Sequence, residues 1–233
     1  MDNDNNDRQA ANNPIERLCE PLSDEQRQQL ERCVEIYQYE RGETIFSIGD
    51  KANHLMLLLN GRVTLYGRGI GDRLHVVRLV RPNGIFGYQA GFADEPQNTT
   101  AVANESLCVA RIPMSVVNRL ISENGRFAML FIRDLSLMLG ISARRLISMT
   151  QKHLRGRLAE TLLAVRRGYG VETDGQTLAI HMSREELAST ANMTTSNAIR
   201  TLSAFAQEGL IAIDGRRIVI LDPDRLQHIS DMG

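Results

Sequence analysis

The sequence has no apolar run near the roughly 18 residues that a membrane span needs. Residues 1–13 are polar and acidic and contain no signal-peptide core. Only three cysteines occur, at positions 19, 33 and 108. An odd and scattered set of thiols excludes a disulfide framework, and it also excludes an iron–sulfur site, which needs closely spaced thiolates. These absences predict a cytoplasmic chain with reduced thiols.

The chain also has little net charge and almost no lysine. Its formal charge at pH 7 is −1 over 233 residues, and its only lysines are Lys51 and Lys152. From residue 153 onward, nine arginines stand against ten acidic residues. Affinity for a nucleic acid would therefore depend on where single arginines lie and not on overall charge. The length allows two domains, each with its own core.

Two short helices joined by a tight turn are indicated after residue 182. Ser183, with Glu186 three residues later, forms a capping-box pattern that predicts the start of a helix. Asn192 then breaks the apolar pattern, and asparagine tolerates the left-handed conformation that a sharp turn requires. Thr194 can cap a second helix. This arrangement is typical of a helix-turn-helix.

The second helix has an apolar face and an opposite face of short polar residues with one arginine. Its apolar positions recur at helical spacing, at Ala198, Leu202, Phe205 and Ala206. A helix with such an opposite face can enter a DNA major groove. We therefore expect DNA contacts from the helix-turn-helix and the segment that follows it: Ser183, Arg184, Thr194, Thr195, Ser196, Asn197, Ile199, Arg200, Ser203, Arg216 and Arg217.

Within that set, Arg200 is the best candidate for base reading, because arginine can bond to guanine O6 and N7 at once. Arg184, Arg216 and Arg217 are either phosphate contacts or solvated surface. Residues 210–213 and 217–221 flank Asp214-Gly215, a strong hairpin signal. Helices and hairpin together predict a winged helix-turn-helix at residues 153–233.

The pattern in the first half of the chain predicts a capped helix at residues 23–35, followed by short strands that are separated by glycine turns. Expected strands are residues 44–46, 55–59, 63–66, 74–80 and 108–112. Many short strands at regular spacing suggest an all-β roll or barrel. From Met114 onward the pattern is helical.

A long helix over residues 127–149 is apolar on more than one side, so it needs two partners. One side can cover the roll and the other can pair with a second copy of the chain; the alternative is one buried helix in a monomer. Expected interface residues are Phe131, Leu135, Met138, Ile141 and Met149. The polar residues 150–153 form the expected hinge.

Several motifs in this order resemble the CRP/FNR family of bacterial transcription regulators. Residues 42–50, 55–59 and 60–63 are similar to the family's cyclic-nucleotide-binding roll, and Phe86-Gly87 through Ala101 resembles its phosphate-binding cassette. Residues 154–157 and onward resemble its DNA-binding domain. The resemblance implies an α+β fold: an N-terminal double-stranded β-helix (jelly-roll-like), a long dimerisation helix and a C-terminal winged helix-turn-helix.

The corresponding domains are a disordered tail at 1–13, a sensor roll at 14–123, a dimerisation helix with hinge at 124–152 and a DNA-binding domain at 153–233. Expected partners are an inverted-repeat DNA duplex, a second copy of the chain and, by resemblance, RNA polymerase, with residues 166–176 as a candidate surface. Activation and repression fit these residues equally.

The cassette departs from the cAMP-binding pattern. The position of the family's ribose-binding Glu is Tyr88, and the Arg-Ser pair that holds phosphate is Asn98-Thr99. A charge-assisted phosphate contact contributes about 1.5–3 kcal/mol, so the sequence predicts that cAMP is not the effector. Neutral groups remain for another small molecule: Gly87, Tyr88, Gln89, Asn98, Thr99 and Thr100. Alternatively, the cassette is only a packed loop.

No catalytic residue, metal site or cofactor is predicted. The five histidines are scattered and form no H-x-H or H-E-x-x-H pair, which speaks against haem, although a ligand-independent or a haem- or redox-responsive regulator stays open. Two alternative interpretations are a cyclic-nucleotide-binding module of an enzyme or channel and a cupin-like enzyme. Both leave residues 183–221 unexplained.

Overall fold

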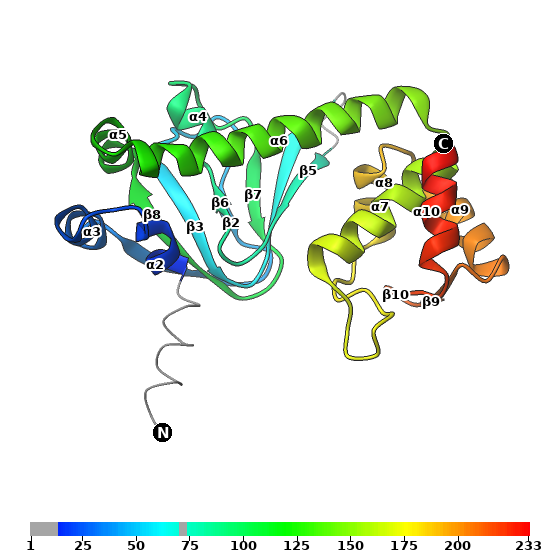
Figure 1. Cartoon of the computed structure of the whole chain (residues 1–233). Helices are drawn as coiled ribbons and strands as arrows, with labels where there is room; N and C mark the ends of the chain where they lie inside the picture. Colours follow the sequence, from blue (N-terminus) through cyan, green and yellow to red (C-terminus); the bar gives the residue numbers. More distant parts are fainter. Residues whose placement is uncertain (1–13, 70–73) are drawn as a thin grey trace. The chain divides into compact units, whose positions relative to one another are not determined.

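The computed structural model describes residues 14–69 and 74–233, and the tail expected to be disordered at 1–13 lies outside these ranges (Figure 1). The chain divides into two compact units, of which the second is Leu137–Gly233. The division falls inside the long helix α6 (Gly125–Gln151). The roll therefore belongs to the first unit and the helix-turn-helix to the second.

Among the described residues, eleven segments, one short helix in the cassette and the start of α6 build the first unit. They are α2 (Pro14–Cys19), α3 (Asp24–Glu31), β1 (Glu35–Tyr39), β2 (Thr44–Phe46), β3 (His54–Asn60), β4 (Val63–Arg68), β5 (Leu74–Val80), β6 (Ile85–Phe86), α4 (Gln89–Phe92), β7 (Thr100–Ala103), β8 (Leu107–Pro113) and α5 (Met114–Glu123). The expected helix at 23–35 is confirmed as the shorter α3, which Ser23 and Gln26 cap as a reciprocal box.

Two antiparallel four-stranded sheets form the roll, in the orders β1-β8-β3-β6 and β2-β7-β4-β5. Strand β3 is buried from Leu55 to Leu58 because both of its faces are covered. Side chains of both sheets, among them Leu58, Val63 and Phe86, meet in one apolar cluster. The roll is confirmed. Strands β1, β6 and β7 were not among the expected strands, because they are short or carry no apolar alternation.

Gly61 lets the chain pass from one sheet to the other across the corner between β3 and β4. Its φ is +75°, in the left-handed region, and a Cβ there would lie 2.6 Å from Leu107 Cβ. Glycine alone meets both conditions without strain. The glycine turn expected after Asn60 is therefore confirmed, with a steric reason that the sequence did not show.

Helices α2, α3, α5 and the first turns of α6 cover the outer face of the sheet that contains β3. Phe127 and Phe131 on α6 are 0% and 2% exposed, and their rings pack edge-to-face at 5.2 Å. Phe131 also packs against Tyr88 and Phe92. The prediction that Phe131 lies in an interface between copies is wrong, because this side chain is enclosed by the roll of its own chain.

The second unit contains the last turns of α6, followed by α7 (Leu154–Tyr169), α8 (Arg184–Thr190), α9 (Thr195–Gln207), β9 (Ile211–Asp214), β10 (Arg217–Ile220) and α10 (Pro223–Met232). Helix α10 packs on α7, and a Cβ at Gly156 would lie 2.5 Å from the carbonyl carbon of Gly233, so α7 needs glycine there. The winged helix-turn-helix is confirmed (Figure 1).

One detail of the hairpin differs from the expectation. Asp214 pairs with Arg217 at the end of the ladder, so the turn residues are Gly215 and Arg216 and not Asp214 and Gly215. Gly215 has a φ of +55°, which is the conformation that a tight hairpin turn requires of its first residue. The turn signal was correct, but the register moved by one residue.

Candidate nucleic-acid interface and sensor site

Helix α8 begins at the predicted residue. Ser183 Oγ accepts a hydrogen bond from the backbone N–H of Glu186 at 3.1 Å, and the backbone N–H of Ser183 donates to Glu186 Oε2 at 2.7 Å. The reciprocal bonds confirm the capping box and satisfy two N–H groups that a helix start otherwise leaves open. The first helix of the motif is therefore fixed in position by its own sequence.

The turn between α8 and α9 follows the predicted chemistry. Asn192 has a φ of +50°, and the backbone N–H of Met193 donates to Ala188 O at 2.9 Å, closing the end of α8. Thr194 Oγ1 then accepts from the backbone N–H of Asn197 at 3.3 Å and caps α9. A left-handed asparagine followed by a threonine cap sets the angle at which α9 leaves the turn.

Helix α9 presents a polar face away from the core of the unit. Ala198, Leu202 and Phe205 are 0–1% exposed, whereas Ile199 is 47% exposed. The exposed side is what we call the α9 ridge, and it consists of Ser196, Ile199, Arg200 and Ser203, with Thr195 and Asn197 half-buried at its start. Arg200 Nη2 donates to Asn197 Oδ1, so these two side chains lie together on the ridge.

The three arginines expected to contact phosphate have different surroundings. Arg184 Nη2 donates to the carbonyl of Gly215 at 2.7 Å, which ties the start of α8 to the hairpin turn. Arg217 Nη2 lies 2.6 Å from Glu172 Oε2, and that carboxylate also lies 3.1 Å from His181 Nε2. Arg216 is exposed at the hairpin turn. Arg184 therefore orients the wing, whereas Arg216 is open to solvent.

Tyr88 in the roll does not line an open site. It is 0% exposed, and its hydroxyl donates to Asp134 Oδ2 on α6 at 2.5 Å. Arg78 Nη2 on β5 lies 3.7 Å from Asp134 Oδ1. Burial, with the bond to Asp134, raises the pKa of the Tyr88 phenol above its usual range, so the phenol keeps its proton. The Tyr88 hydroxyl is therefore already bonded to a residue of its own chain.

The other cassette residues either accept hydrogen bonds from neighbouring residues or are partly or fully exposed to solvent. Gly87 has a φ of +75°, and its carbonyl accepts from Gln97 Nε2 at 2.7 Å. Thr100 Oγ1 accepts from the backbone N–H of Ile48 at 3.1 Å. Gln89 and Thr99 are half-buried and Asn98 is exposed. The cassette therefore holds itself together through contacts between its ends and its neighbouring strands.

Sequence reasoning missed Asp134, Arg78 and Gln97. A signal for Asp134 existed, because it lies three residues after Phe131 on the covered face of α6, where an acid needs a partner. Nothing in the sequence paired it with Tyr88, which is 46 positions away.

Helix α6 carries exposed apolar residues along its outer side. Their spacing of three and four residues is that of a coiled-coil seam, interrupted by Ser142. We call this set the α6 seam: Ile132, Leu135, Leu139, Leu146 and Met149, which are 53%, 39%, 73%, 65% and 40% exposed. Leu135 and Met149 were expected interface residues. Met138 is half-buried and Ile141 lies on another side of the helix.

Two parts of the chain match described domains. Residues 36–124 match the cyclic nucleotide-binding domain and residues 156–229 match the Crp-like helix-turn-helix domain. No helix among the described residues is long and apolar enough to cross a membrane. Within the same ranges no three His, Cys, Asp or Glu side chains gather as metal ligands would.

Relatives of known function match over most of the chain. The "CRP-like cAMP-activated global transcriptional regulator" of Mycobacterium tuberculosis is 22% identical over 198 residues, covering 84% of this chain and 88% of that protein. The "Global nitrogen regulator" of Synechococcus elongatus is 26% identical over 198 residues, covering 84% and 89%.

Among solved structures, FixK2 from Bradyrhizobium japonicum has a TM-score of 0.75 at 20% identity, covering 84% of this chain and 96% of that chain. The c-di-GMP-responsive regulator CLP of Xanthomonas campestris has a TM-score of 0.75 at 19% identity, covering 85% and 99%. At these identities the structures establish a shared fold.

Proposed function

Because the chain belongs to the CRP/FNR family of transcription regulators, we propose that it acts as a homodimer that binds an inverted-repeat operator. The proposal places it in the cytoplasm, where it reaches DNA. Its activity is governed by a signal at the roll, and that signal is not cAMP.

The α9 ridge is the observation that carries the proposal. It combines hydroxyls, one exposed isoleucine and one guanidinium on a helix whose opposite face is fully buried. In this proposal Arg200 reads guanine, Thr195 and Ser196 contact bases or phosphates, and Ile199 meets a thymine methyl. Since Thr195 and Ser196 are uncharged, the half-site differs from those of relatives that carry charged residues there.

A dimer through the α6 seam supports the inverted repeat. Exposed leucines at coiled-coil spacing are costly in water and are covered when two such helices pair. Two copies related by a two-fold axis present their ridges to successive major grooves, about 34 Å apart. The operator half-sites should then lie about one helical turn apart, in opposite orientation.

The cassette chemistry supports a signal other than cAMP. Asn98 and Thr99 offer no positive charge to a phosphate, and the Tyr88 hydroxyl already bonds to Asp134. A cyclic nucleotide would have to bury its charge without the arginine fork that normally neutralises it. A different small molecule remains compatible with the neutral groups of the cassette.

The contact between Tyr88 and Asp134 favours a second candidate, a regulator that needs no ligand. It joins the cassette to α6 directly, so α6 can be held in place without an effector. Cys19 is not a candidate redox sensor, because burial raises the pKa of its thiol to about 11. A thiol that stays protonated is slow to react with oxidants.

Contact with RNA polymerase is proposed at residues 166–176. This segment begins in the last turn of α7. It contains an ordered turn, in which Asp174 Oδ1 accepts from the backbone N–H groups of Gln176 and Thr177 at 3.0 and 2.9 Å. A fixed turn at the surface gives a partner a defined shape to bind. Repression by promoter blocking needs no such contact.

Selection from randomised duplexes with the purified full chain tests the function. The expected result is an enriched inverted repeat bound by a species of twice the 26.1 kDa chain mass. A monomer without sequence preference would contradict the proposal. Calorimetric titration with cAMP separately tests the proposal that the signal is not cAMP. Micromolar binding would overturn that part of the proposal and leave DNA binding unaffected.

A further inference from the structure

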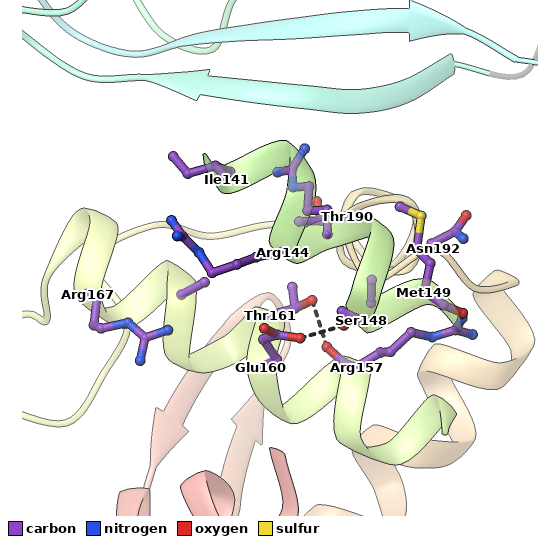
Figure 2. Close-up of a pocket in the computed structure, with 13 residues that line it drawn as sticks. Ile141, Arg144, Ser148, Met149, Arg157, Glu160, Thr161, Arg167, Thr190 and Asn192 are labelled. Atoms are coloured by element: carbon purple, nitrogen blue, oxygen red, sulfur yellow. Dashed lines mark hydrogen bonds between the residues drawn. The ribbon is translucent and has the colours of Figure 1, made fainter. Parts of the chain in front are cut away.

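A cavity of about 290 Å³ lies inside the second unit (Figure 2), and no residue of the α9 ridge is among its lining residues. The last turns of α6, one side of α7 and the turn between α8 and α9 form its walls. Arg144 and Arg145 reach it from α6, Arg157 and Arg167 from α7, and Asn192 from the turn. Three elements that are separate in sequence thus meet at one hollow.

The cavity is strongly cationic in a chain whose formal charge is −1. Its lining has four arginines and one carboxylate, Glu160. That carboxylate is already used, since Ser148 Oγ donates to Glu160 Oε2 at 2.5 Å and Lys152 Nζ lies 3.3 Å from the same oxygen. Within this lining the guanidinium groups therefore outnumber the carboxylates, and an anion would relieve their mutual repulsion.

The Arg157 side chain at this cavity has a buried N–H group without an acceptor in the described part of the chain. Its Nη1 donates to the carbonyl of Met149 at 3.4 Å, which holds the side chain against the end of α6. Its Nε–H is buried and has no acceptor among the described residues. Buried donors nearly always have a partner, so an orphaned one at a cationic cavity indicates a missing acceptor. Burial also lowers the pKa of Arg145, because desolvation disfavours its charge.

We propose that this cavity binds a small, multiply charged anion of the phosphate class. Arginine forks match the oxygens of phosphate two at a time, which lysine cannot do. The volume is slightly below the roughly 300 Å³ at which sites for drug-sized ligands begin. It fits a phosphate ester or a pyrophosphate group.

An anion in the cavity would join α6 to the helix-turn-helix. The same oxygens could accept from Arg144 on α6 and Arg167 on α7, next to the turn that sets the direction of α9. Occupancy would favour the arrangement in which these elements lie close together, and so bias the position of the ridge. The site is separate from the cassette of the roll and does not depend on the proposed operator.

Calorimetric titration of the full chain with sodium pyrophosphate tests the proposal, with sodium chloride at the same ionic strength as the blank. The expected result is saturable binding at one site per chain. The double variant R144Q/R167Q, which changes two exposed side chains, should bind at least tenfold more weakly. The control R126Q/R225Q removes the same charge at exposed positions outside the cavity and should bind as the wild type does.

A second measurement needs no variant. In the wild type, pyrophosphate should move the ¹H–¹⁵N signal of Arg157 Nε–H, because that donor gains an acceptor. Heats equal to the chloride blank, equal binding by R144Q/R167Q, or an unmoved Arg157 signal would each overturn the proposal. If the arginines serve duplex phosphates instead, pyrophosphate does not bind and R144Q/R167Q weakens binding to any duplex, which also overturns it.

Discussion

The Tyr88 hydroxyl lies 2.5 Å from Asp134 Oδ2, so a residue of the cassette is bonded directly to the long helix. The phenol ring is enclosed by Phe92 and Phe131, at centroid distances of 5.3 and 5.5 Å. Asp134 also faces Arg78 at 3.7 Å. Three segments of the first unit therefore meet at one carboxylate, and removal of the hydroxyl affects all of them.

Tyr88→Phe should lower the free energy of unfolding by about 1.5 kcal/mol, the low end for a bond to a charged group. The low end applies because the Asp134 side chain is 26% exposed, so water replaces part of the lost bond. Urea denaturation followed by circular dichroism measures the change. Tyr37→Phe is the matched control, because its hydroxyl donates to Glu35 at the surface; a change as large there would contradict the assignment.

Arg200→Ala should weaken binding to the selected operator by about 1–3 kcal/mol while leaving binding to an unrelated duplex almost unchanged. The reason is that a base contact contributes only at the matching sequence. Fluorescence anisotropy with both duplexes at one salt concentration provides the comparison. Arg225→Ala is the control, since its side chain is 60% exposed and near Asp222. An operator preference that survives Arg200→Ala would remove this residue from base reading.

Leu139→Glu should convert the dimer to a monomer, because it places a charge in the centre of the α6 seam. Leu137→Glu should not, although Leu137 is 66% exposed against 73% for Leu139. The two positions differ by about 200° around the helix axis, at 3.6 residues per turn. Sedimentation velocity at several concentrations distinguishes the two masses. Dimers in both variants would place the interface elsewhere.

Cys19 should resist thiol reagents at pH 8, whereas the half-buried Cys33 and Cys108 react first. Burial is the main cause that raises the Cys19 pKa to about 11. Because the folded pKa lies above the unfolded value, the resulting stability is present below about pH 8.5 and is lost as pH rises towards 11. Timed labelling with mass mapping measures the order. Early modification of Cys19 in the native chain would contradict it.

Local signals carried most of what the sequence predicted about the second unit. Ser183, Asn192 and Thr194 each act on the backbone within three or four residues, so their effect can be read without knowing the fold. The predicted hairpin register was wrong by one residue, because Asp214-Gly215 and Gly215-Arg216 are both acceptable turn sequences. The ladder between β9 and β10 decided between them.

Contacts between distant segments explain what the sequence did not predict. Phe131 and Ile132 are equally apolar neighbours, and only the position of the roll determines that Phe131 is buried and Ile132 exposed. Likewise the sequence predicts Tyr88 to be a free polar group of the cassette, because its partner lies on another element. The short strands β1, β6 and β7 exist through pairing with longer neighbours and not through their own composition.

The bond from Arg184 to the Gly215 carbonyl limits how the protein can adapt to its target. Displacement of the hairpin tip must stretch or break this bond, so moving the tip away from the beginning of α8 costs free energy. Where a groove is too wide or too narrow for the wing, part of the adjustment therefore falls to the duplex, and its deformation costs free energy. Stiffness of the base steps beneath the wing should then influence affinity even at positions that no side chain touches.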